Sequence, residues 1–198
     1  MATSFMDKLE AQAFRAGLTK GTDEARKWFK NKLKDIKTVN RRQLLKDDNF
    51  KSARRTLPGR MYMYFYNPKT KADLPYYDRF PLIFMVEKAK GGFYGLNLHY
   101  LPPNLRAILF DKLQVFTNNN KYTDTTKLRM TYKMLNGVTK YKEFKPCFKH
   151  YLSSQINSRL VEVPASEWES VLFLPTEYFT KANKTKVWAE SRKIIKKR

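Results

Sequence analysis

The chain has 198 residues, and its 40 lysines and arginines against 18 aspartates and glutamates give a formal net charge of +22. Hydrophobic residues make up 42% of the sequence and aromatic residues 15%, which excludes a chain that is disordered throughout. The single cysteine, Cys147, excludes an internal disulfide, and no apolar run approaches the roughly 20 residues that a transmembrane helix needs. We therefore expect a soluble intracellular protein whose charge serves a polyanionic partner.

Residues 1–57 predict a helical N-terminal extension that ends in a polar linker. Apolar residues recur at three- and four-residue spacing over residues 3–17, as they do in an amphipathic helix. Thr22 is a suitable N-cap for a second helix, which is expected to run to about Lys37. Residues 40–58 are polar and charged, and they predict a linker or an arm.

Residues 58–175 carry the strongest β-strand signal and predict the core of the protein. Over residues 61–66, methionine or phenylalanine alternates with tyrosine, which indicates a strand with two different apolar faces. Two further strands are expected over residues 82–87 and 93–100, joined by a hairpin turn at residues 90–92. Short strands at this density predict a small β-barrel of the SH3-like or OB-like kind.

Helices are expected to flank this core, so that the predicted fold class is α+β. One helix begins near Pro103, another covers residues 125–135, and a returning strand is expected at residues 160–163. Residues 176–198 predict a basic C-terminal helix and tail. We expect the two ends of the chain to pack on neighbouring chains or on nucleic acid, and packing on the chain's own core is the alternative. The residues expected in the core are Phe84, Phe93, Leu96, Leu98 and Leu109.

Catalytic and metal-binding chemistry finds little support in the residue types present. The two histidines, His99 and His150, together with Cys147 supply fewer than the four ligands of a tetrahedral zinc site. A metal-dependent nuclease needs clustered carboxylates, and the nearest pattern, Asp78 followed by Glu87, misses the usual acidic-spacer-lysine order by one residue. We expect no enzyme activity, no metal and no cofactor, and a small nuclease is the weakest alternative.

Basic residues gather in segments that suit contact with nucleic-acid phosphates. Lysines and arginines supply most of the affinity for DNA because they neutralise phosphates and release counterions. Between residues 140 and 151 lysines alternate with aromatic rings, a pattern that suits stacking on exposed bases and equally suits a core face. No motif for sequence-specific reading of bases is present. The residues predicted to bind nucleic acid are Arg41, Arg42, Arg54, Arg55, Lys140, Lys142, Lys145, Lys149, Arg192, Lys193, Lys196, Lys197 and Arg198.

Three segments, residues 61–69, 74–82 and 92–102, resemble a family of bacteriophage virion proteins. The second of them contains the run Tyr76-Tyr77-Asp78-Arg79-Phe80, and the resemblance extends over about residues 60–155. The family is that of the DNA end protectors, or head-completion proteins, of T-even-like contractile-tailed phages and their marine relatives. The resemblance implies a non-enzymatic protein that binds the end of packaged double-stranded DNA near the portal or neck and shields it from exonuclease.

The resemblance also implies where the protein works and with which partners. It predicts a component of the virion that is present in the host cytoplasm during assembly, with DNA and phage portal, neck or tail subunits as partners. A homo-oligomer remains open, and no membrane association is expected. The alternative is a structural neck, tail or baseplate subunit, whose charge serves acidic neighbours or lines a DNA channel.

Overall fold

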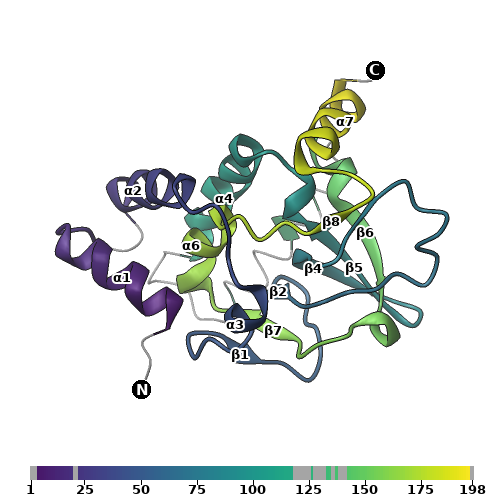
Figure 1. Cartoon of the computed structure of the whole chain (residues 1–198), viewed down its shortest axis with the longest axis horizontal. Coiled ribbons are helices and arrows are strands. Elements are labelled where there is room, and N and C mark those ends of the chain that lie inside the picture. Colours follow the sequence, from purple (N-terminus) through teal and green to yellow (C-terminus); the bar gives the residue numbers. More distant parts are fainter. Residues whose placement is uncertain are drawn as a thin grey trace.

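The computed structural model describes residues 4–19, 22–117, 126, 133–134, 137 and 142–196. The helices are α1 (Phe5–Arg15), α2 (Asp23–Lys34), α3 (Arg41–Leu44), α4 (Pro103–Thr117), α6 (Trp168–Phe173) and α7 (Lys184–Lys196). Short 3-10 turns are η1 (Leu98–Tyr100), η2 (Lys142–Cys147), η3 (Ser153–Gln155) and η4 (Ala165–Glu167). Figure 1 shows α1, α2, α4 and α6 gathered on one side of the view and the strands on the other. This mixture of helices and an antiparallel sheet confirms the predicted α+β class.

The two N-terminal helices begin where the sequence predicted them. Ser4 and Asp7 form a capping box, in which each side chain accepts a hydrogen bond from the other residue's backbone N–H. The Thr22 hydroxyl accepts a hydrogen bond from the Ala25 N–H at 3.2 Å and begins α2. In both helices, side chains thus satisfy backbone N–H groups that the first turn leaves open.

One antiparallel sheet has the strand order β1-β7-β2-β4-β5-β6. Its strands are β1 (Lys51–Ser52), β2 (Met61–Met63), β4 (Leu82–Ala89), β5 (Gly92–Asn97), β6 (Phe148–Leu152) and β7 (Val161–Val163). A separate two-stranded ribbon pairs β3 (Tyr77–Asp78) with β8 (Phe179–Thr180). The edge strands β1 and β6 do not pair with each other, so the described strands form an open sheet and not the predicted SH3-like or OB-like barrel. Closure requires the edges to pair, and β1 is only two residues long.

The hairpin between β4 and β5 has the predicted turn. Gly91 has a φ of 73°, a left-handed conformation that glycine adopts without strain. Gly92 packs closely on β6, because a Cβ at this position would lie 1.8 Å from the backbone oxygen of Tyr151. Strand β5 ends earlier than predicted: the Asn97 side chain accepts a hydrogen bond from the His99 N–H and begins the η1 turn.

The two faces of the sheet carry different apolar residues, as the alternation of methionine and tyrosine predicted. Met61 and Met63 belong to the main hydrophobic core. Tyr62 and Tyr64 lie in a second buried cluster, which is rich in tyrosine.

The predicted helix over residues 125–135 lies almost wholly outside the described residues. Of the predicted core residues, Phe84, Phe93, Leu96 and Leu98 are buried, and the side chain of Leu109 lies outside the described ones.

Both ends of the described chain pack on the chain's own core, which is the alternative that the sequence left open. In α1, Met6 is fully buried and its N–H donates to the Asp47 carboxylate. In α7, Val187 is fully buried, and the Trp188 indole N–H donates to the His99 carbonyl oxygen at 2.8 Å. Both terminal helices are therefore integral parts of the fold.

Candidate nucleic-acid interface

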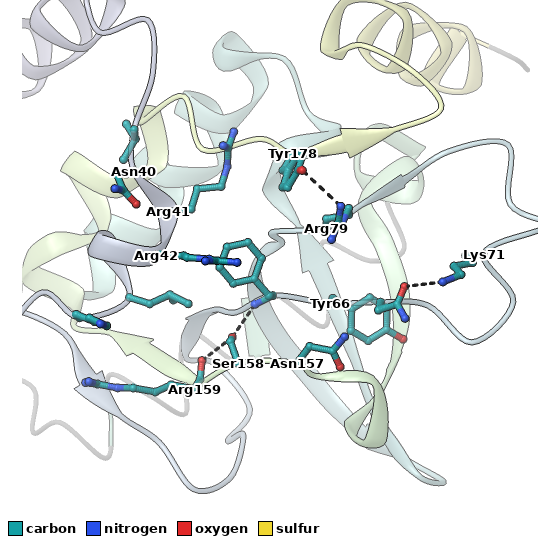
Figure 2. A pocket seen from close by; sticks show the side chains of 15 residues that line it. Asn40, Arg41, Arg42, Tyr66, Lys71, Arg79, Asn157, Ser158, Arg159 and Tyr178 are labelled. Atoms are coloured by element: carbon teal, nitrogen blue, oxygen red, sulfur yellow. Dashed lines mark hydrogen bonds between the residues drawn. The ribbon is translucent and has the colours of Figure 1, made fainter.

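A pocket of about 1150 Å³ opens between α3, the segment after β2 and the loop that follows η3. Figure 2 shows its side chains converging from these elements, with Arg79 and Tyr178 on one side and residues 157–159 on the other. We call it the basic pocket because six of its lining residues are cationic. These are Arg41, Arg42, Lys46, Lys71, Arg79 and Arg159.

The charges of the basic pocket are not balanced from within. All of its lining residues belong to the described part of the chain, and none of them is an aspartate or a glutamate. Arg42, Lys46 and Arg159 are exposed, and among the described residues none of the three forms an ion pair. Like charges that are held together without counter-charges create a positive potential that attracts anions.

Arg41 fixes one wall of the basic pocket. Its guanidinium donates to the carbonyl oxygens of Thr176 and Glu177, at 2.8 and 2.7 Å. The same guanidinium lies 4.9 Å from the ring centroid of Tyr178, and that of Arg79 lies 5.0 Å from the same centroid. Arg41 is therefore half-buried and bound to the fold, whereas Arg79 is exposed and faces the pocket.

A buried polar network holds the same wall from the inside. The Asp78 carboxylate accepts a hydrogen bond from the Tyr178 N–H at 3.2 Å and lies 2.6 Å from His99 Nδ1. His99 Nε2 in turn lies 3.0 Å from the Thr176 hydroxyl. Burial by itself raises the pKa of Asp78, but the charge of His99 and the hydrogen bonds that the carboxylate accepts outweigh it and hold this pKa below its ordinary value.

Glu177 belongs to a buried ion pair. Arg106 is 1% exposed, and its Nη2 donates to Glu177 Oε1 at 2.5 Å. Arg106 also donates to the carbonyl oxygens of Leu101 and Leu172. Burial raises the pKa of Glu177, and the opposing charge of Arg106 brings it below its ordinary value. These paired charges position residues 176–178, and thereby the wall of the basic pocket.

Of the residues predicted to bind nucleic acid, Arg41 and Arg42 line the basic pocket. Lys149 is half-buried on β6, where its Nζ lies 4.4 Å from the Tyr100 ring centroid, and burial lowers its pKa. Lys145, Arg192, Lys193 and Lys196 are exposed on η2 and α7, which pack against each other. Lys140, Lys197 and Arg198, together with the side chain of Lys142, lie outside the described residues.

Arg54 and Arg55 follow the edge strand β1, in a segment whose backbone lies next to the one that carries Arg159. Both are exposed just after β1. The Ala53 N–H donates to the Leu160 carbonyl oxygen at 2.9 Å, so the backbone before Arg54 runs beside the backbone after Arg159.

Four cations of the basic pocket were not identified from the sequence: Lys46, Lys71, Arg79 and Arg159. They stand in four different segments, and none of them is adjacent in the sequence to another basic residue, so the local pattern does not single them out. Arg79 lies within one of the segments that resemble the phage family, which is the only available signal.

The aromatic residues between positions 140 and 151 belong mainly to the interior. Phe144 and Tyr151 are each 4% exposed. Phe148 is half-buried and stacks on Tyr94, with ring centroids 5.1 Å apart. The core interpretation of this strip therefore holds for these rings.

The groups considered for catalysis are occupied elsewhere in the fold. Burial raises the pKa of the Cys147 thiol to about 12, and the thiol donates to the Phe144 carbonyl oxygen. Asp78 lies in the buried network, whereas Glu87 is exposed on β4.

Within the described ranges, no group of three or more His, Cys, Asp or Glu side chains is placed to hold a metal ion. Over the same ranges, no helix has the length and apolar character to cross a bilayer.

Comparison with known proteins identifies the family of the chain. Residues 1–197 match the family described as the phage T4 terminal DNA protecting protein. The chain belongs to this family. The match covers almost the whole chain, including the N-terminal helices and α7, whereas the resemblance noted from the sequence covered about residues 60–155. No curated protein and no solved structure matches the chain.

Membership of the terminal DNA protecting family identifies the polyanion that the net charge of +22 predicted. The protein is a bacteriophage protein that binds DNA ends and protects them. Phosphates are the charged groups of DNA, and the arginines and lysines of the basic pocket, with no carboxylate among its lining residues, suit them.

Proposed function

We propose that the basic pocket holds the phosphates at the end of the DNA. The observation that carries the proposal is the composition of the pocket: six arginine or lysine side chains and no carboxylate among its described lining residues. Hydrogen bonds from the surrounding fold hold its wall at residues 176–178. Arg41 and the wall beside it are therefore ordered before DNA binds, which lowers the entropic cost of binding.

A duplex that occupies the basic pocket would continue over Arg54 and Arg55. These two arginines follow the strand that lies beside Arg159, so a backbone leaving the pocket meets further positive charge. Contacts of this kind fix the position of a duplex without reading its sequence. The protein would then cover the terminal nucleotides that an exonuclease must reach, and protection would follow from steric exclusion.

The predicted cations outside the basic pocket are proposed as secondary contacts. Lys145, Arg192, Lys193 and Lys196 form an exposed basic surface on η2 and α7, which suits a second stretch of DNA backbone or an acidic partner. Lys149 belongs to a different cavity, beside β6. Lys140, Lys142, Lys197 and Arg198 stay predictions from the sequence.

We further propose that the protein acts near the portal or neck of the particle, in contact with portal, neck or tail subunits. A protein that holds the end of packaged DNA must be where that end is, and the basic surface of α7 leaves a second face for assembly. We also propose that copies of this chain associate with one another. Cross-linking within purified particles would identify the neighbouring chains.

The test of the basic pocket is protection of a linear duplex against a processive exonuclease. The variant carries Arg42→Glu and Arg159→Glu, two exposed side chains without ion pairs among the described residues. The matched control carries Lys27→Glu and Lys30→Glu on the exposed face of α2, which changes the net charge by the same amount.

We expect the pocket variant to lose protection and the α2 control to retain it at the same protein concentration. Equal protection by both variants would overturn the assignment of the pocket. A third variant, Arg192→Glu with Lys193→Glu, measures the contribution of α7 in the same assay. If that variant alone lost protection, the DNA site would lie on α7.

A further inference from the structure

A second cavity, of about 420 Å³, lies beside the basic pocket, and five of its fourteen lining residues are tyrosines. It lies between the loop that follows β2, strand β3 and strand β6. Tyr66 lines both cavities, so the two share a wall. We call the second one the aromatic cavity; its aromatic side chains include Tyr66, Tyr76, Tyr77, Tyr100 and Tyr151.

Tyr77 is the ring of the aromatic cavity that the fold leaves without a partner. It is half-buried, and within the described residues its ring touches no other aromatic ring and its hydroxyl forms no hydrogen bond. The other rings are engaged. Tyr76 packs against Tyr100 with centroids 6.0 Å apart, and the Tyr66 hydroxyl accepts a hydrogen bond from the Leu152 N–H at 3.1 Å.

The aromatic cavity is lined by two lysines, Lys69 and Lys149, and by no available carboxylate. Lys149 lies over the Tyr100 ring and has no ion-pair partner among the described residues. Asp78 also lines the cavity, but its two oxygens already accept hydrogen bonds within the buried network. Flat rings beside positive charge match the chemistry of a nucleobase and its attached phosphate.

One loop forms a wall of both cavities, and it is held in place. The Lys181 ammonium donates to the carbonyl oxygens of Lys71 and Ala72, each at 2.8 Å, and to that of Leu74 at 3.0 Å. Lys71 lines the basic pocket and Leu74 lines the aromatic cavity. The spacing between the two cavities is therefore fixed by the fold.

We propose that the aromatic cavity receives an unpaired terminal base of the DNA, stacked on Tyr77, while the adjoining phosphates lie in the basic pocket. This inference rests on the proposed function of the basic pocket. Phosphates are alike at the end and in the interior of a duplex, so phosphate contacts alone do not select an end. A terminal base pair is stacked on one side only, so its opening costs less than that of an internal pair. A cavity for one unpaired base thus selects ends.

The test compares a linear duplex with a covalently closed minicircle of the same sequence, at equal concentrations of base pairs. We expect Tyr77→Ala to weaken binding to the linear duplex by about tenfold, which is the effect of losing one stacked base. Binding to the minicircle should stay unchanged, which also shows that the variant is folded. Tyr77→Phe, which keeps the ring, is the matched control and should bind both as the unaltered protein does.

Equal weakening on both DNA forms, or no weakening on the linear one, would overturn the aromatic cavity as the site of end recognition. A second measurement needs no variant. A terminal mismatch leaves the end base unpaired beforehand, so the unaltered protein should bind the mismatched duplex several-fold more tightly than the matched one. Absence of that gain would also overturn the inference.

If the proposed function of the basic pocket were wrong, the binding measurements would differ from those that overturn the aromatic cavity. The variant with Arg42→Glu and Arg159→Glu should weaken binding to both the linear duplex and the minicircle, because it removes phosphate contacts that both DNA forms offer. If that variant bound both forms normally, the basic pocket would be the wrong site, whatever the outcome for Tyr77.

Discussion

Two groups of charged side chains meet at residues 176–178, and they differ in whether the fold supplies their partners. On the inner side, Asp78 lies against His99, and Arg106 is paired with Glu177, all of them buried. On the outer side, the exposed cations of the basic pocket, such as Arg42 and Arg159, form no ion pair within the described chain.

This difference separates structural charge from functional charge. A buried charge is tolerated only when a partner and hydrogen bonds compensate for its lost hydration, so the inner group specifies the fold. Exposed cations that face one pocket repel one another, and the fold gains nothing from their proximity. The proposal that they hold DNA, which members of this family protect, accounts for their arrangement.

The largest effect is expected from breaking the inner group at Arg106. Arg106→Ala leaves the Glu177 carboxylate buried without its counter-charge, which costs about 3–5 kcal/mol of unfolding free energy. Urea unfolding measures this loss. The double variant Arg106→Ala with Glu177→Ala should be less destabilised than the sum of the single variants, and strict additivity would show that the pair is not coupled.

Acid should weaken the inner group at a defined point. The pKa values of Asp78 and Glu177 are held below their ordinary values of 3.8 and 4.5, so both carboxylates stabilise the folded state fully above those values. This stabilisation is lost as the pH falls through the lowered pKa values, at about 1.4 kcal/mol for each unit of pKa depression. The free energy of unfolding, measured at a series of acidic pH values, should decrease as the pH falls below these ordinary pKa values. The decrease should be shallower in Asp78→Asn.

Removing one outer cation should affect DNA binding and leave stability nearly unchanged. Arg159→Ser is expected to reduce the slope of log affinity against log salt by about 1, because one phosphate contact is lost. Its unfolding free energy should stay within about 0.5 kcal/mol of the unaltered value. A salt titration monitored by fluorescence anisotropy measures the slope. An unchanged slope would show that Arg159 makes no phosphate contact.

The smallest effect is expected at Tyr178, where the two groups meet. Tyr178→Leu removes the ring that Arg41 and Arg79 share, and each exposed cation–π contact is worth about 0.5–1 kcal/mol. Arg41 keeps its two carbonyl partners, so we expect Arg79 to be the side chain that loses its position. DNA affinity should fall by a few-fold, and Tyr178→Phe should be close to neutral.

Local features of the sequence determined much of the secondary structure. Ser4 and Thr22 are caps that act on their own helices, and Gly91 and Gly92 mark a turn that needs glycine. The alternation of methionine and tyrosine across β2 predicted a strand with two buried faces. Each of these signals involves residues that are close in the chain, so the pattern alone carries the information. The division of the chain at residues 57 and 175 stays a prediction.

The net charge of +22 and the phage-like segments were sufficient to predict a DNA partner, but not the place where DNA binds. Arg42, Arg79 and Arg159 come from three distant segments, and only the folded chain brings them to one pocket. The same holds for the open sheet, in which β7 inserts between β1 and β2. Pairing between distant segments depends on the packing of the whole chain and leaves no local periodicity, so only the tertiary structure decided the sheet order and the site.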